Sequence, residues 1–297
     1  MLLMSILFIM NIQNIKYSAS AYPDRLRHIA SPPNQLYLVG DKALLADSDT
    51  PWVAIVGTRY PTEYGRQVTY QLASELAAAG AIIVSGLALG IDAIAHEAAT
   101  AQGATVVAVQ ARGMDKIYPK DNRNLAKKIL EYNGAIVSEY SVGVEAFRQN
   151  FIARNRIVSG LSDAILITEA NEESGTGHTV RFAQEQNKIV MAVPGNITSK
   201  RSAGTNNLLR QGAKVVTSAS DVLAELGFKS GINLKPIKAA SREEGILIDL
   251  MREGIGHSEE LIARSGFSAA EFANLITLME ISGKIHNLGA GTWVLRR

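Results

Sequence analysis

Short glycine-containing turns in this chain carry side chains that could bind phosphate. Gly57-Thr58-Arg59 directly follows an apolar segment, Ser85-Gly86 opens a second turn, and Ser174-Gly175-Thr176 comes before a helical pattern. Backbone N–H groups, hydroxyls and a cation at a strand end or a helix start form a cradle for an anion. A plain turn between a strand and a helix is the alternative, because the first turn is not GxGxxG and lacks the acidic ribose ligand.

The segment Phe147–Arg156 concentrates arginine and phenylalanine. The guanidinium groups of Arg148, Arg154 and Arg156 are fork-shaped donors suited to phosphate. An exposed Phe151 ring would offer a stacking platform for an unpaired base. The same composition also fits a solvated helix face with buried phenylalanine, so a nucleic-acid contact and a surface helix are both open.

Histidine and acidic side chains do not indicate an active site. The chain has five histidines and no cysteine, and the histidines lack a metal-ligand spacing such as HExxH. Asp92 can cap the helix that follows it, and Asp163 and Glu169 can cap or pair locally around a buried strand. We therefore expect no catalytic residue, no metal and no cofactor.

The candidate residues lie where strand patterns end. From Trp52 to about Leu226, short segments rich in Val and Ile alternate with amphipathic segments. This alternation predicts a Rossmann-like α/β fold, with a mostly parallel sheet and helices on both faces. Ligands of such sheets bind beyond the carboxyl ends of the strands, where the glycine-containing turns fall. The predicted strands are 52–57, 81–85, 104–110, 135–139, 164–170, 188–193 and 214–217, and the predicted helices are 64–79, 91–102, 122–132, 180–186 and 205–211.

The C-terminal part has a different pattern. Helices over 241–254, 257–264 and 269–282, followed by strands over 284–286 and 292–295, predict a small winged-helix domain in 241–297, after a linker in 227–240. This domain carries six Lys and Arg against eight Asp and Glu, a net charge of −2. Duplex binding depends on phosphate neutralisation, so a protein contact is favoured over a DNA-reading role.

The composition is typical of a globular protein of the reducing cytoplasm. The 297 residues are 47% hydrophobic and 20% charged, with a formal net charge of +2, so a polyanionic partner needs a local basic patch. The absence of cysteine excludes disulfides and a cysteine nucleophile. Residues 1–21 are an apolar leader, expected not to form a domain. Its apolar run is too short to span a bilayer and has no preceding Lys or Arg, which favours a packed or frayed leader over a signal peptide.

In combination, these segments resemble the DprA/Smf (DNA-processing protein A) family. The matching motifs run in order over roughly 22–226 as VAIVGTR, SGLALGID, IYPKDN, SEY, FIARNRIVSGLSDA, SGT, VPG and GTNNLL. The resemblance implies a homodimer that binds single-stranded DNA, recruits the recombinase RecA and protects incoming DNA in natural transformation. Carried over by motif, the DNA contacts would be Arg59, Arg148, Phe151, Arg154 and Arg156. One departure is Gly-His-Thr after Gly175-Thr176, where many members have an apolar pair before the threonine.

A nucleotide phosphoribohydrolase on a related Rossmann-like fold is the alternative function. The signature of those enzymes is PGGxGTxxE, and Ser174–Thr179 echoes its glycines. Arg181 and Phe182 stand where the catalytic glutamate would be expected. The ordered motifs GTR, SGLALGID and GTNNLL therefore favour a DNA-binding protein without turnover.

Overall fold

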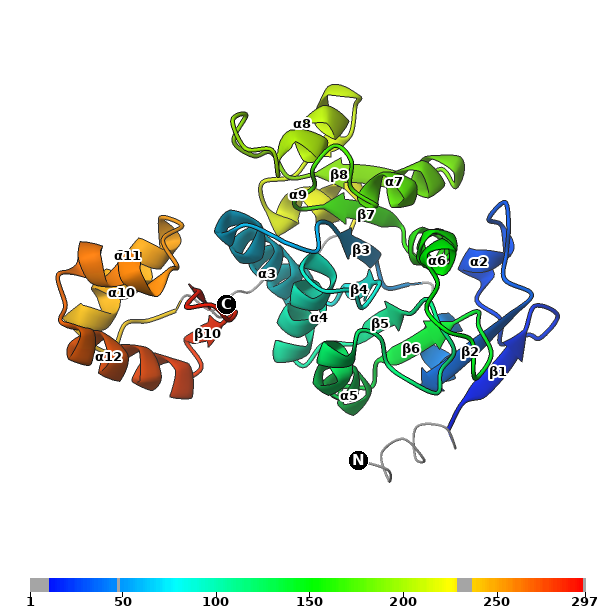
Figure 1. The fold of residues 1–297 in the computed structure, drawn as a ribbon, viewed down its shortest axis with the longest axis horizontal. Coiled ribbons are helices and arrows are strands. Elements are labelled where there is room, and N and C mark those ends of the chain that lie inside the picture. Colours follow the sequence, from blue (N-terminus) through cyan, green and yellow to red (C-terminus); the bar gives the residue numbers. More distant parts are fainter. Residues whose placement is uncertain (1–10, 47–48, 229–236, 296–297) are drawn as a thin grey trace.

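The computed structural model of the chain describes residues 11–46, 49–228 and 237–295. Residues 1–10 of the predicted leader and 229–236 of the predicted linker lie outside the described residues. The main body is one nine-stranded sheet with helices on both of its faces (Figure 1). The predicted α/β class is confirmed.

The strand order of the sheet is β1-β2-β6-β5-β4-β3-β7-β8-β9, and all pairs from β6 to β9 along this order are parallel. The chain runs outward from β3 through β4, β5 and β6, and then returns to place β7 on the other side of β3. The β3–β7 boundary is therefore the topological switch point, where such sheets bind ligands. The strands are β1 (Gln13–Lys16), β2 (Gln35–Gly40), β3 (Trp52–Val56), β4 (Ile82–Ser85), β5 (Val106–Val109), β6 (Ala135–Ser138), β7 (Ala164–Ile167), β8 (Ile189–Ala192) and β9 (Lys214–Val215).

Helices follow most of the parallel strands, as the sequence pattern predicts. They are α2 (Asp24–Arg27), α3 (Glu63–Ala78), α4 (Ile91–Ala101), α5 (Arg123–Glu131), α6 (Arg148–Leu161), α7 (Thr176–Glu185), α8 (Ala203–Arg210) and α9 (Ala219–Glu225), with short 3₁₀ helices η1 (Lys42–Ala46) and η2 (Lys120–Asn122).

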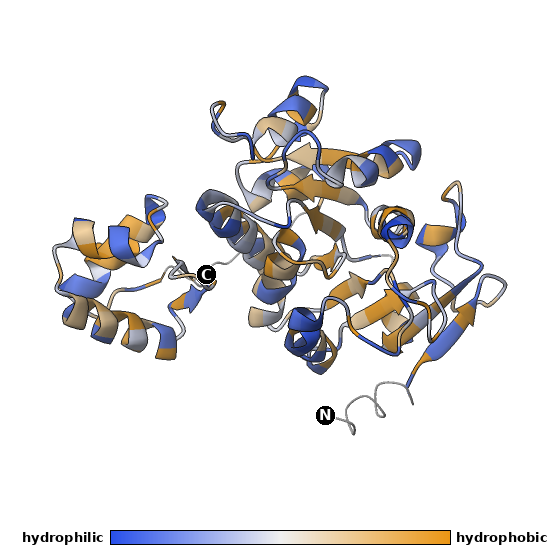
Figure 2. Ribbon diagram, viewed as in Figure 1, coloured by the Kyte–Doolittle hydropathy of each residue, from blue (hydrophilic) through white to orange (hydrophobic). Residues whose placement is uncertain are grey.

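Side chains from both faces of the sheet form two cores. Val53 and Ile55 of β3 pack with α3 and α4 on one face, whereas Trp52, Ala54 and Val56 pack with α6 and α7 on the other. All five of these β3 side chains are buried, because a parallel strand covered on both faces has no solvent side. Figure 2 shows the result as apolar central strands between helices whose outer sides are hydrophilic.

The N-terminal strands are the part of the sheet that the sequence did not predict. β1 pairs with β2 and β2 pairs with β6, both antiparallel. β1 lies within the expected leader, yet it is hydrogen-bonded to β2. The sheet therefore begins at Gln13, before the expected start of the domain at Tyr22. The other predicted domain boundaries stay predictions.

The C-terminal unit contains the predicted three helices and hairpin. These are α10 (Arg242–Arg252), α11 (Ser258–Ser265), α12 (Ala269–Ile281), β10 (Ile285–Asn287) and β11 (Trp293–Leu295). The helices enclose a core of their own, which includes Leu247, Leu261 and Met279. The hairpin lies against α3 (Figure 1), where the Thr292 hydroxyl donates to the Glu63 carboxylate and Val294 joins the core beneath α3.

Among the described residues, no helix combines the length and the apolar character needed to cross a membrane.

Candidate nucleic-acid interface

A pocket of about 710 Å³ opens at the switch point, between the residues that follow β3, the residues that follow β7, and the first turns of α6. It brings together most of the predicted site. Its lining includes Gly57, Thr58, Arg59, Arg148, Phe151, Arg154, Ser174, Gly175 and Thr176. Of the predicted residues, Ser85, Gly86 and Arg156 do not line it.

The turn that carries Arg59 is held by backbone hydrogen bonds on both sides. The Thr58 N–H donates to the Glu169 carbonyl (2.8 Å), and the Ile91 N–H donates to the Thr58 carbonyl (3.1 Å). A Cβ on Gly57 would lie 2.6 Å from the Glu169 carbonyl oxygen, so this close approach requires glycine. The fixed turn leaves the Arg59 side chain exposed at the pocket.

The Phe151 ring is in contact with both a cation and a second aromatic ring. The Arg59 guanidinium carbon lies 5.4 Å from its centroid, and the Tyr118 ring centroid lies 5.6 Å away. Phe151 is half-buried and lines the pocket, so its ring is neither a core residue nor fully open to solvent. An incoming base that stacks on it would compete with Arg59 for the ring.

Arg148 stands in the first turn of α6 and is exposed. Within the described residues its guanidinium has no recorded hydrogen bond or ion pair. A phosphate can therefore reach Arg59 and Arg148 in this pocket without breaking an ion pair.

The start of α7 closes the opposite side of the pocket. Gly175 is the N-cap residue, and the Ser174 hydroxyl accepts from the Thr176 N–H at 3.3 Å. Ser174 and Gly175 are at least partly exposed while Thr176 is buried. Amides and hydroxyls at a helix start suit an anion, as the sequence predicted.

Arg154 is bound by protein groups. Its side chain is buried, and its Nη1 donates to the carbonyls of Gly86 and Val109. Burial lowers the pKa of Arg154 to about 10, against the attraction of the nearby Asp92 carboxylate. This geometry makes Arg154 a link between α6, the turn after β4 and the end of β5.

Asp92 holds the same turn from the other side. Its carboxylate accepts from the Gly86 N–H at 3.0 Å and from the Ala88 N–H at 3.4 Å. Burial raises the pKa of Asp92, and the Arg154 guanidinium opposes that rise. The N-cap position of α4 is Gly90, so Asp92 braces the preceding turn instead of occupying the cap.

Arg156 and Ser85 also serve the fold. The Arg156 guanidinium makes a bidentate pair with the Glu139 carboxylate at 2.7 and 2.8 Å and donates to the Ser31 carbonyl at 2.8 Å. The Ser85 hydroxyl is buried and donates to the Ile55 carbonyl at 2.6 Å. Neither side chain is presented to the pocket.

Arg201 and Tyr118 lie at this pocket, and the sequence patterns did not single them out; Tyr118 is placed there by its contact with the Phe151 ring. Arg201 lines the pocket, and its Nη1 donates to the Thr58 hydroxyl at 3.2 Å. The signal for Arg201 was its position in the loop that leaves β8 and re-enters α8 at the same sheet edge. Tyr118 lies in the IYPKDN motif, but no spacing rule places that motif beside Phe151.

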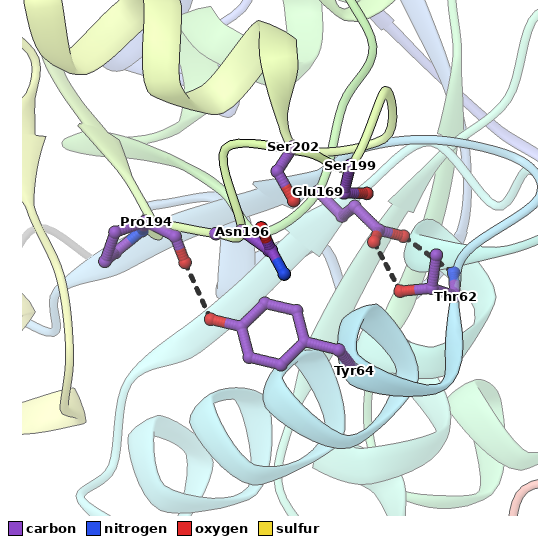
Figure 3. A pocket seen from close by; sticks show the side chains of 8 residues that line it. Thr62, Tyr64, Glu169, Pro194, Asn196, Ser199 and Ser202 are labelled. Atoms are coloured by element: carbon purple, nitrogen blue, oxygen red, sulfur yellow. Dashed lines mark hydrogen bonds between the residues drawn. The ribbon is translucent and has the colours of Figure 1, made fainter.

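A second, smaller hollow adjoins this interface (Figure 3). Its lining includes Thr62, Tyr64 and Asn196, and Glu169 forms part of its wall. The Glu169 carboxylate accepts from the Thr62 N–H at 2.7 Å and from the Thr62 hydroxyl, which caps the start of α3. The Tyr64 hydroxyl donates to the Pro194 carbonyl at 2.7 Å. Glu169 thus pairs with the N-cap residue of α3, 107 residues away in sequence, instead of capping or pairing locally. The hollow borders the turn that carries Arg59.

In the part of the chain that the structure describes, no group of three or more His, Cys, Asp or Glu side chains is placed to hold a metal ion.

Fold and site together define a Rossmann-like α/β protein with a basic, aromatic pocket at the switch point of its sheet. The family model described as DNA recombination-mediator protein A matches residues 13–227. The chain belongs to this family, and the resemblance seen in the sequence motifs is confirmed.

Known relatives agree with this assignment. The chain is similar to DNA processing protein DprA of Bacillus subtilis, with 38% identity over 72% of this chain and 71% of that protein. It is also similar to Protein Smf of Synechocystis, with 42% identity over 69% of this chain and 52% of that protein, so it spans about half of that relative's length.

Two solved structures share the fold. DNA processing protein A from Streptococcus pneumoniae aligns with a TM-score of 0.68 and 35% identity, over 75% of this chain and 77% of that one. DNA processing protein A from Helicobacter pylori, whose structure concerns a single-stranded DNA binding mode, aligns with a TM-score of 0.63 and 38% identity, over 72% of this chain and 95% of that one.

Proposed function

We propose that this protein is a recombination mediator that binds and protects single-stranded DNA in the cytoplasm and loads RecA on it during DNA uptake, without catalytic turnover. The observation that carries the proposal is the pocket in which exposed Arg59 and Arg148 stand beside the Phe151 ring. Cations that hold the backbone and an aromatic platform for the bases are the combination that unpaired strands require. The single-stranded DNA binding named for the Helicobacter pylori relative supports the same function.

Single strands should bind more tightly than duplex. A base that is paired inside a duplex cannot turn its face to Phe151, whereas the phosphates of both forms can reach Arg59 and Arg148. The aromatic contact therefore provides the preference, and the guanidinium groups provide affinity that depends on salt.

Two substitutions separate the two kinds of contact. Arg148→Ala should weaken binding and lower the slope of log affinity against log salt by about 0.7, the value for one phosphate of a single strand. Phe151→Ala should cost about 1–3 kcal/mol with little change in that slope, because stacking releases few counterions. Fluorescence anisotropy with a labelled oligonucleotide, repeated at several salt concentrations, measures both effects.

Arg210 supplies a matched control, because it is an exposed arginine in the last turn of α8 and does not line the pocket. Arg210→Ala should leave the affinity and the slope unchanged. If Phe151→Ala unfolds the protein in a thermal melt, the ring is a core residue and the stacking role fails. If Arg148→Ala and wild type have the same slope of log affinity against log salt, Arg148 does not contact a phosphate.

The proposed assembly is a homodimer formed through the α/β domain. Light scattering at micromolar concentration should give twice the 31.9 kDa mass of one chain. A single-chain mass at every concentration would contradict the dimer. The RecA partnership is tested separately, by asking whether the protein accelerates RecA assembly on a single strand.

The C-terminal unit is proposed to be a winged-helix domain that contacts protein partners. Deleting Gly227–Arg297 should leave single-strand binding within about tenfold of wild type, or about 1.4 kcal/mol. A larger loss would mean that this acidic unit contributes to the DNA site. The alternative function, a nucleotide phosphoribohydrolase, is tested by incubating the protein with nucleoside monophosphates. Release of the free base would show that the protein is such an enzyme.

A further inference from the structure

We propose that Tyr118 forms a second base-stacking position, so that two consecutive unpaired bases are held at Phe151 and Tyr118. This inference rests on the proposed function and extends its site beyond the pocket. The ligand class is an extended single-stranded nucleic acid whose bases are unstacked from one another.

Tyr118 is the more accessible of the two adjoining rings. It is 44% exposed, whereas Phe151 is half-buried and contacts both Tyr118 and the Arg59 guanidinium. The two ring planes are tilted by 57°, so they do not stack on each other and each can present a face of its own. A base arriving from solvent therefore meets Tyr118 without displacing Arg59.

The loop that carries Tyr118 is anchored to the protein on both sides of the ring. Ile117 packs against the main core, and the buried Asn122 amide donates to the carbonyls of Leu87 (2.8 Å) and Ala88 (3.2 Å). Leu87 and Ala88 belong to the same turn that Asp92 braces. The ring is thus held beside the pocket in advance of binding, which reduces the ordering cost of a contact.

Cations continue along this loop. Lys120 and Arg123 are exposed, and within the described residues neither side chain has a recorded hydrogen bond or ion pair. They follow Tyr118 by two and five residues, and two cations against the exposed Asp121 between them leave this segment a net charge of +1. A strand whose bases reach Phe151 and Tyr118 would have phosphates for these cations to neutralise.

The tilt of the rings favours an extended strand. Because the two ring planes differ by 57°, bases lying on them would be tilted against each other and could not stay stacked as neighbours in a duplex do. Neighbouring bases can occupy both rings only when they have separated from each other. This requirement adds to the discrimination against duplex.

The test compares Tyr118→Ala, Tyr118→Phe and the control Tyr132→Ala in anisotropy titrations with a single-stranded oligonucleotide. Tyr132 is 43% exposed and lies at the far end of α5, so it matches Tyr118 in exposure but not in place. We expect Tyr118→Ala to weaken binding about tenfold with an unchanged salt slope, and both other variants to bind like wild type. A 2-aminopurine base in the oligonucleotide should also be quenched less by Tyr118→Ala than by wild type.

Wild-type affinity and quenching in Tyr118→Ala would overturn the inference while leaving the proposed function intact. Failure of the wild-type protein to bind the oligonucleotide would overturn both. If a thermal melt shows that Tyr118→Ala is unfolded, Tyr118→Leu decides instead, because leucine fills the space without a ring face. Binding by that folded variant equal to wild type would contradict the stacking position.

Discussion

Replacing Asp92 by Asn should weaken DNA binding although it removes a negative charge near the pocket. The Asp92 carboxylate accepts from the Gly86 and Ala88 N–H groups and faces the buried Arg154 guanidinium. Arg154 in turn ties α6, the helix that carries Arg148 and Phe151, to the carbonyl of Gly86. Loss of the charge should therefore disturb the placement of the DNA-contacting side chains.

The size of the effect follows from what remains after the substitution. Asparagine keeps one acceptor oxygen for the Gly86 and Ala88 N–H groups but removes the charge that attracts the buried Arg154 guanidinium. Because Arg154 keeps its bonds to the Gly86 and Val109 carbonyls, we expect a loss of about 1.5–3 kcal/mol of unfolding free energy, the contribution of hydrogen bonds to a charged group. A tenfold loss of affinity, about 1.4 kcal/mol, is the expected consequence for DNA.

Chemical denaturation and salt-dependent anisotropy titrations of Asp92→Asn and Arg154→Gln measure both quantities. Neither substitution should change the slope of log affinity against log salt if both residues act by positioning the DNA-contacting side chains. Tighter or unchanged binding by Asp92→Asn would show that Asp92 does not position the DNA-contacting side chains and acts only through its charge. A slope lowered by about 0.7 in Arg154→Gln would show that Arg154 contacts phosphate after all.

Three further predictions concern stability. Burial lowers the pKa of His96 to about 3, so between pH 6.5 and 3 the unfolded chain binds a proton at this imidazole and the folded chain does not. The contribution of His96 to stability is therefore complete above pH 6.5 and is lost as the pH falls toward 3. In denaturation series from pH 7 to 4, His96→Leu should reduce the pH slope of stability by up to about 1.4 kcal/mol per unit, and an unchanged slope would count against a neutral buried imidazole. Gly86→Ala should destabilise the protein by about 1–3 kcal/mol, because the new Cβ would lie 2.3 Å from the Arg154 guanidinium. The control Gly245→Ala in α10 has space for its Cβ and should stabilise the protein by about 0.5–1 kcal/mol. Equal shifts of the melting temperature in the two variants would contradict the close contact at Gly86. Thr292→Val removes the donor to Glu63 and should lower the melting temperature by an amount equivalent to about 1–3 kcal/mol, and an unchanged melt would show that this hairpin contact adds no stability.

The parallel strands and their order along the chain could be predicted because their apolar runs are buried on both faces. No polar side chain interrupts Trp52–Val56 or Ala164–Ile167. Such short, fully apolar segments are typical of parallel strands that are covered on both faces. The glycine-containing turns after such strands had to meet at one edge of the sheet. That geometry accounts for the correct grouping of Arg59 with the Ser174–Thr176 turn.

The N-terminal strands escaped prediction because their patterns are short and mixed. Gln13–Lys16 has one buried residue among polar ones, and Gln35–Gly40 lies between two antiparallel neighbours that only the folded chain brings together. Local composition does not encode such distant pairing. The same reason hides the bond between Arg156 and Glu139, which are seventeen residues apart.

The burial of Arg154 could have been read from helical spacing. Arg154, Ile157, Val158 and Leu161 stand at i, i+3, i+4 and i+7, which is the buried face of α6. Arg148 lies off this stripe and is exposed. The composition of the segment does not distinguish Arg148 from Arg154. The helical period does, because it places Arg154 on the buried face and Arg148 off it.

Single-stranded DNA should bind over Phe151 in the switch-point pocket. The most direct test irradiates the protein with a single-stranded oligonucleotide that carries 5-iodouracil, then maps the cross-linked peptides by mass spectrometry. We expect cross-links in the peptides that contain Phe151 and Tyr118. Cross-links confined to residues 241–297 would contradict DNA binding at this pocket.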